Sequence, residues 1–177
     1  MLNKELFPFN SSNTTGIKAK VLSTNTSNDL IYFGVKASGN RFWVGNMNNT
    51  VLYFGINGGY SDQATIAANQ VYDVKMNYKN DRKFAVDDNV VQSSMPTFTG
   101  NSTKLSIFAG NVDGSISNRS SIKLYDFEIT NNSDVVAHYL PCYRTSDSKP
   151  GLCDMVGGNF ITTPDGVTNL AKGPDLF

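Results

Sequence analysis

Charged side chains are scarce in this chain. Asp, Glu, Lys and Arg make up 17% of the 177 residues, and 15 basic residues balance 15 acidic ones. No basic stripe is present to neutralise phosphates, so nucleic-acid binding is not expected. Asn, Ser and Thr supply the surface polarity instead. Because Asn and Ser favour turns over helix interiors, their abundance predicts many turns and few helices.

Long apolar runs are also missing. No segment approaches the roughly twenty apolar residues that are needed to span a bilayer. The N-terminal stretch 1–8 lacks the uninterrupted apolar core of a secretory signal peptide. We therefore expect the sequence as given to be soluble, without contact with a membrane.

Apolar side chains instead alternate with polar ones at the period of a β-strand. The clearest case is 71–78, in which Tyr72, Val74, Met76 and Tyr78 are predicted to face one way. Further strands are predicted at 17–22, 30–35, 41–44, 50–56, 84–86, 90–91, 105–109 and 122–129, with a polar loop at 110–115 and a short helical turn or loop at 64–68. Short strands separated by polar turns predict an all-β sandwich of two antiparallel sheets. We expect one domain at 15–177 and a tail or linker at 1–14.

An aromatic hairpin is predicted where 41–44 and 51–54 flank a turn centred near Met47 and Asn48. In that register Trp43 lies opposite Leu52, and both faces of the hairpin are apolar. One face must line the core, and the other is either covered or forms an aromatic groove for a sugar. The candidate ligand-binding residues in this region are Arg41, Trp43, Asn46, Tyr53, Asn57 and Tyr60. A lone Trp in a sandwich is more often a core residue, so both interpretations stay open.

Groups with a catalytic arrangement are not apparent. Sandwich-fold glucanases place paired carboxylates over the sugar, and the nearest match is Asp126 with Glu128, two residues apart on one strand face. No third carboxylate follows, so we interpret the pair as solvated strand residues. His138 is the one histidine, and we interpret it as a surface or pocket-edge imidazole. We predict that the chain is not an enzyme.

Five different segments follow one another in the last third of the chain: 122–129, 140–144, 151–154, 158–160 and 172–175. Together they resemble the closing part of concanavalin A-like (laminin-G-like) jelly-roll modules, which occur in bacteriophage tail and fibre proteins and in surface proteins of gut bacteria. The resemblance implies a two-sheet jelly-roll sandwich of the lectin and glucanase type. It also implies a virion or an extracellular cell surface as the location.

The same resemblance, with the aromatic hairpin, implies a non-catalytic carbohydrate- or surface-binding module with a role in adhesion. Its partner would be a glycan or a host-cell receptor. The alternative is a structural module that decorates or oligomerises a virion, as a homotrimer or with other virion domains, without binding a glycan.

Calcium is a further expectation of the resemblance, because many laminin-G-like modules bind Ca²⁺ at a sheet rim through Asp side chains and backbone carbonyls. The acidic residues in rim-like positions are Asp87, Asp88 and Asp113. Asp at a tight turn usually bonds its own backbone, and we favour that interpretation over a metal site.

The two cysteines, Cys142 and Cys153, flank a predicted hairpin at 143–152 with its tip at Asp147 and Ser148. Symmetry about the tip places them roughly opposite one another, within reach of a disulfide. In the resembling family the second position is typically Tyr or Trp. A virion protein assembled in the cytoplasm would keep both residues reduced. We therefore expect two free thiols, with the disulfide as the alternative.

Overall fold

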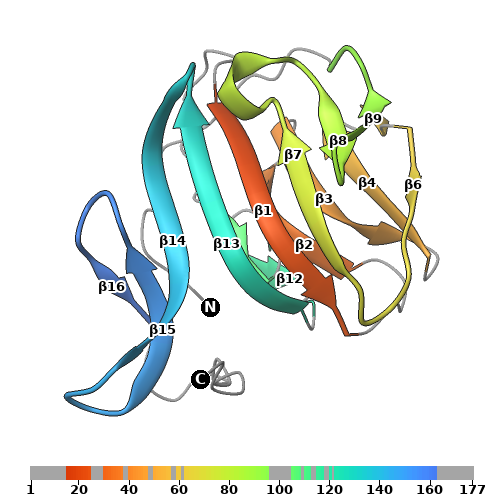
Figure 1. Cartoon of the computed structure of the whole chain (residues 1–177). Coiled ribbons are helices and arrows are strands. Elements are labelled where there is room, and N and C mark those ends of the chain that lie inside the picture. The colour runs from red at the N-terminus through yellow and green to blue at the C-terminus, as the bar shows by residue number, and fades with distance from the viewer. Residues whose placement is uncertain are drawn as a thin grey trace.

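The computed structural model describes residues 15–24, 30–37, 40–47, 50–56, 59–60, 62–95, 105–108, 110–112, 115–117, 120 and 122–162. These residues form two β-sheets, one in front of the other in Figure 1. Within this part of the chain, no helix has the length and apolar character that crossing a membrane requires.

The first sheet, which we name the β13 sheet, has eight strands in the order β16-β15-β14-β13-β1-β7-β8-β9. Its strands are β1 (Thr15–Ser23), β7 (Val71–Met76), β8 (Phe84–Val86), β9 (Asn89–Gln92), β13 (Ile122–Asn131), β14 (Asp134–Arg144), β15 (Lys149–Asp154) and β16 (Phe160–Ile161). A single 3₁₀ turn, η1 (Tyr78–Asn80), follows β7.

The second sheet, which we name the β3 sheet, has the order β12-β11-β2-β3-β4-β5, with β10 paired to β2 and β6 paired to β4. Its strands are β2 (Leu30–Ala37), β3 (Asn40–Met47), β4 (Val51–Ile56), β5 (Gly59–Tyr60), β6 (Ala64–Thr65), β10 (Ser106–Ile107), β11 (Gly110–Val112) and β12 (Ser115–Ser117). The described ladders are antiparallel apart from one parallel bridge between Asn111 and Val35.

The core lies between the two sheets. Alternate residues of each strand face it, and aromatic rings join the sheets by edge-to-face contacts. The ring centroids of Phe33 (β2) and Phe127 (β13) are 5.2 Å apart, and those of Phe54 (β4) and Phe84 (β8) are 5.1 Å apart. The predicted all-β sandwich of two antiparallel sheets is confirmed. The predicted tail at 1–14 lies outside the described residues.

The strand predicted at 71–78 ends earlier than expected. Tyr72, Val74 and Met76 face the core as predicted, but Tyr78 does not continue the series. Asn77 adopts a left-handed backbone conformation with φ 46°, which reverses the chain after β7 and begins η1. The prediction that Tyr78 shares the buried face is therefore wrong.

The structure also differs from the sequence-based expectation at three other places. Trp43 lies opposite Gly55, because β3 continues through Met47 and the turn of the hairpin follows it. The predicted register was three residues out, and an odd shift exchanges the two faces of a strand. Residues 110–115 were expected as a loop, but β11 and β12 pair there as a hairpin. At 64–68 the structure has the short strand β6 and a turn, without a helix.

Candidate functional site: a polar network on the outer face of the β13 sheet

The outer face of the β13 sheet, which points away from the core, carries a cluster of charged side chains. Core residues of β13 alternate with Asp126 and Glu128, which therefore face outward. Lys18 of β1 pairs with Glu128 on one side, and His138 of β14 pairs with it on the other. The antiparallel register thus brings these side chains together from three adjacent strands.

The four side chains and Tyr78 are joined by direct contacts, and we name the five residues the polar network. Lys18 Nζ donates to Asp126 Oδ2 at 3.3 Å and to Glu128 Oε1 at 3.2 Å. His138 Nε2 lies 2.7 Å from Asp126 Oδ1, and the Tyr78 hydroxyl donates to Glu128 Oε2 at 2.6 Å. Each carboxylate oxygen therefore has a partner. The Asp126 and Glu128 side chains are only 19% and 13% exposed, so our interpretation of them as solvated strand residues is wrong.

Tyr78 enters the network because η1 folds back over the end of β1. The Asn77 side chain donates from Nδ2 to the Thr15 carbonyl at 3.0 Å. On the other side, the Lys79 backbone N–H donates to Thr130 Oγ1 at 3.1 Å. Both Asn77 and Thr130 are buried, so these bonds fix the turn firmly.

The close approach of η1 requires a glycine below it. A Cβ at residue 16 would collide with the backbone of Asn77 and would lie 2.7 Å from Thr130 Oγ1. Gly16 therefore lets the turn lie against β1, and it sets the height at which Tyr78 meets Glu128.

The network perturbs two of its own members. Burial raises the pKa of Tyr78, and its hydrogen bond to Glu128 adds to the effect, so that the pKa rises to about 12. Burial lowers the pKa of Lys18, but the hydrogen bonds and charges of Glu128 and Asp126 outweigh burial and raise the pKa above its usual 10.5. Lys18 is therefore a permanent cation, and Tyr78 a permanent hydrogen-bond donor, at physiological pH.

Asp126, Glu128 and His138 are also the residue types that hold a metal ion. One ligand atom from each lies within 4.8 Å of the other two. However, the Lys18 ammonium already contacts both carboxylates, so a metal ion would have to displace a cation that is held in place. The geometry therefore favours an ion-pair network over a metal centre.

The predicted ligand-binding residues that the structure describes lie in the other sheet. Tyr53 is 2% exposed and Asn46 is fully buried, which counts against a direct contact of either with a ligand. Trp43 is half-buried, with its ring 4.7 Å from that of Tyr53 in an edge-to-face contact. The structure does not describe the side chains of Arg41 and Tyr60 or any part of Asn57.

Glycine again explains how Trp43 is placed. A Cβ at residue 55 would lie 2.5 Å from Trp43 Nε1, so the indole rests directly on the backbone of Gly55. The outer face of the β3 sheet is thus apolar here, and Tyr53 on that face is covered. Of the two alternatives for this face of the hairpin, the burial of Tyr53 favours the covered one.

The acidic residues expected at a calcium site have other partners where they are described. Asp87 and Asp88 form the two-residue turn between β8 and β9, with φ of 50° and 63°, as in a type I′ hairpin. Asp87 Oδ1 accepts from the Asp73 backbone N–H at 2.8 Å, and Asp88 forms an ion pair with Lys75. Asp113 lies outside the described residues, and the possibility of a calcium ion at this rim stays untested.

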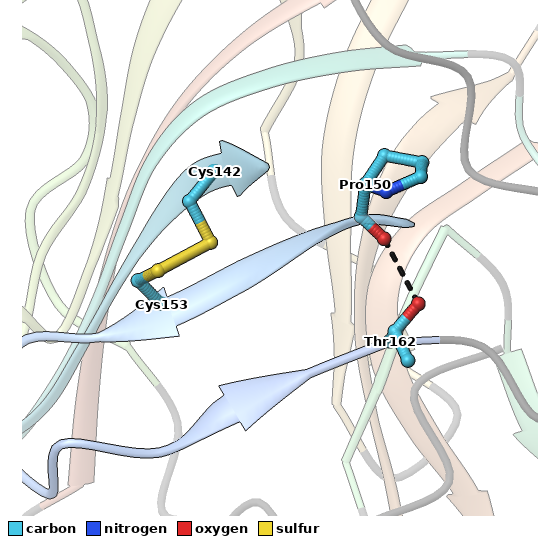
Figure 2. The surroundings of a disulfide bond; sticks show 4 residues. All are labelled: Cys142, Pro150, Cys153 and Thr162. Carbon is cyan, nitrogen blue, oxygen red and sulfur yellow. Dashed lines mark hydrogen bonds between the residues drawn. A yellow bond between two sulfur atoms is a disulfide. The ribbon is translucent and has the colours of Figure 1, made fainter. Parts of the chain in front are cut away.

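The two cysteines are joined by a disulfide bond, so our expectation of free thiols is wrong (Figure 2). The hairpin tip lies one residue earlier than predicted, since Arg144 pairs with Lys149. Cys142 and Cys153 are therefore diagonal neighbours on β14 and β15, and their Cα atoms are 5.8 Å apart, within the range that a disulfide bridges. Next to the bridge, Thr162 Oγ1 donates to the Pro150 carbonyl at 2.8 Å and holds the chain after β16 against β15.

Comparisons of the chain with protein-family models, with curated proteins and with solved structures found no match.

Only part of the polar network could be predicted from the sequence. Asp126, Glu128 and His138 stood out by residue type, whereas Lys18 and Tyr78 did not, because they are far from β13 in the chain. Lys18 could have been found as the polar residue between two apolar ones in the strand at 17–22, but only the strand order makes it a neighbour of Glu128.

Proposed function

We propose that this chain is a non-catalytic carbohydrate-binding module and that it binds a glycan on the outer face of the β13 sheet, at the polar network. The observation that carries the proposal is the fixed mixture of donors and acceptors in the network. Lys18 uses two of its three N–H groups on the carboxylates. The carboxylates accept four contacts and retain further lone pairs. Sugar hydroxyls both donate and accept, so they match such a surface better than a purely anionic or cationic ligand.

The direction of the network supports a chain-like ligand. Lys75, Lys18, Glu128 and His138 are paired in register on β7, β1, β13 and β14. They form a row across the strands, and three strand spacings give the row a length of about 14 Å. A row of that length fits an oligosaccharide that lies across the sheet rather than a single sugar.

Preorganisation supports binding as well. The side chains of the network are half-buried and hydrogen-bonded to one another, so little side-chain freedom is lost when a ligand binds. Tyr78 is held by η1, and Asp126 and Glu128 are held by Lys18. A glycan that binds here would contact side chains that already have their bound positions, so its binding would cost little side-chain entropy.

The same contacts argue against catalysis by the paired carboxylates. Glycosidases need one carboxyl group that gives up a proton and another that attacks or activates water. Here the Lys18 ammonium contacts both carboxylates, so neither of them faces a substrate without a bound cation beside it. The proposal therefore includes no hydrolytic role for Asp126 and Glu128.

The disulfide supports an oxidising setting, since such bonds persist in extracellular environments. We extend the proposal to a module of a virion or of a cell surface, with the jelly-roll topology that the last third of the sequence resembles. Adhesion to a glycan or to a glycosylated host receptor is the role that fits such a setting.

A glycan-array screen of the purified domain, with and without calcium, tests the proposal. Glu128→Gln removes the charge of a central residue, and Asp134→Asn is the matched control at an exposed acid on β14. We expect saturable binding that Glu128→Gln weakens by roughly tenfold or more, since hydrogen bonds to charged groups contribute about 1.5–3 kcal/mol, and that Asp134→Asn leaves unchanged. A folded domain that binds no glycan contradicts the proposal, and a homotrimer found in that case would favour the structural alternative.

A further inference from the structure

Two apolar side chains are exposed in the turn between β15 and β16. Met155 is 60% exposed and Val156 is 54% exposed, the largest exposures among the large hydrophobic side chains in the described part of the chain. Adjacent exposed apolar residues at a tight turn contribute nothing to the core. Loops that carry such residues on a rigid scaffold are frequent sites of binding.

The turn that presents them is held by its own hydrogen bonds. Val156 N–H donates to Asp154 Oδ1 at 3.0 Å, and Gly158 N–H donates to the Asp154 carbonyl at 2.8 Å. Asp154 N–H donates to the Asn159 carbonyl at 2.8 Å, and Asn159 Nδ2 donates to the Gly157 carbonyl at 3.1 Å. The two apolar side chains are therefore presented by a closed turn of fixed shape.

The register places the turn beside the polar network. Met155 N–H donates to the His138 carbonyl at 2.7 Å, which continues the β14–β15 ladder beyond the pair of Tyr139 with Asp154. Tyr139 faces the core and the next residue, His138, faces the outer side of the sheet, so the turn that begins at Met155 lies beside His138. In Figure 1 the loop between β15 and β16 accordingly lies beside the middle of β14.

From these positions we infer that the Met155–Val156 turn is the apolar wall of the glycan site and that the ligand carries a methyl group next to the sugar that contacts His138. The inference rests on the proposed function and adds the ligand class: a neutral oligosaccharide with a methyl-bearing substituent, such as an N-acetyl group or the methyl of a 6-deoxyhexose. The row on the outer face then runs from charged residues at Lys75 to an apolar end at Met155. A ligand that is polar along its length and methylated at one end complements both parts.

Binding measurements with matched glycan pairs test the inference. The probes are chitotetraose against cellotetraose, which differ in the N-acetyl group, and L-fucosylated against L-galactosylated oligosaccharides of equal length, which differ in the methyl group at C6. Wild-type protein should bind at least one methyl-bearing member about fourfold or more tighter than its partner, as expected from burial of one methyl-sized group. The double substitution Met155→Ser and Val156→Ser should bring that ratio close to one. Val90→Ser, at a valine that is 52% exposed on β9 at the far edge of the same sheet, should leave the ratio unchanged.

The outcomes separate the inference from the function on which it rests. Glycan binding with the same preference in wild type and double variant overturns the apolar wall and leaves the proposed function intact. Wild-type binding without preference for the methyl-bearing probes overturns the ligand class. Absence of glycan binding by folded wild-type protein overturns both. Thermal unfolding of the double variant close to that of wild type would show that a changed ratio reflects binding and not damage to the fold.

Discussion

Lys18 Nζ lies 3.2 Å from Glu128 Oε1, and the two residues are direct partners on β1 and β13. The same ammonium contacts Asp126, so one cation holds two half-buried carboxylates. Removing it leaves both charges without their cation in a partly desolvated place. Lys18→Met should therefore lower the free energy of unfolding by about 1–3 kcal/mol, measured by urea denaturation. Lys20→Met, at an exposed lysine of the same strand, is the control, and equal losses in the two variants would contradict the role of Lys18.

The raised pKa values of Lys18 and Tyr78 predict a loss of stability in alkali. Both groups keep their protons more tightly in the folded state than in the unfolded chain. Their contribution is therefore complete below about pH 10 and falls as the pH rises through the folded-state pKa values, near 12 for Tyr78. Urea unfolding between pH 8 and pH 11.5 should show this decline, and Tyr78→Phe should make it shallower. Tyr143→Phe, at an exposed tyrosine, is the control, and an equal change there would contradict the assignment.

The close packing of η1 against β1 at Gly16 should affect both the stability of the fold and the position of Tyr78 in the polar network. Gly16→Ala would place a Cβ against Asn77 and Thr130 and lift η1 from β1. We expect a loss of about 1–3 kcal/mol in the free energy of unfolding and a lower pKa for Tyr78, seen in the absorbance of the tyrosinate. Gly158→Ala is the control, because a Cβ there meets no atom within 4 Å and only its φ of 68° is unfavourable. If Gly158→Ala lowers the pKa of Tyr78 as much as Gly16→Ala does, the claim that Gly16 positions Tyr78 through η1 is contradicted.

The disulfide predicts that protein purified without reductant has no titratable thiol when it is unfolded. Replacement of both cysteines by serine should lower the free energy of unfolding by about 3 kcal/mol, as expected from chain entropy for a short loop. The separation of 11 residues sets this value, and no other cysteine is present to exchange with the pair. Two thiols per chain in the unfolded wild-type protein would contradict the bond.

Alternation of apolar residues was sufficient to predict the sandwich and many of its strands, because the faces of β1, β7 and β13 follow the pattern closely. The pattern did not give the end of β7, where the left-handed Asn77 turns Tyr78 to the opposite face. The alternation of apolar residues also did not predict the register of the β3–β4 hairpin. The loop between these strands is shorter than the polar residues suggested, and both faces of the hairpin are apolar. A pattern with two apolar faces cannot fix a register.

The site could be predicted only in fragments for a related reason. Asp126, Glu128 and His138 are visible as chemical types, but their meaning depends on Lys18, more than a hundred residues away, and on Tyr78. The order of the strands in the sheet decides which residues become neighbours, and this order cannot be derived from the pattern of apolar residues. Trp43 is the one tryptophan of the chain, and the sequence does not show that its ring lies against Tyr53 and the backbone of Gly55.

Titration of isotope-labelled protein with soluble oligosaccharides, followed by chemical-shift mapping, tests the central claim most directly, because it reports both sheets at once. The account predicts that saturable shifts concentrate on Lys18, Tyr78, Glu128, His138 and the neighbouring Met155, while the indole N–H of Trp43 stays in place. Shifts centred on Trp43 and the β3–β4 hairpin, or no shifts with any oligosaccharide, would contradict it.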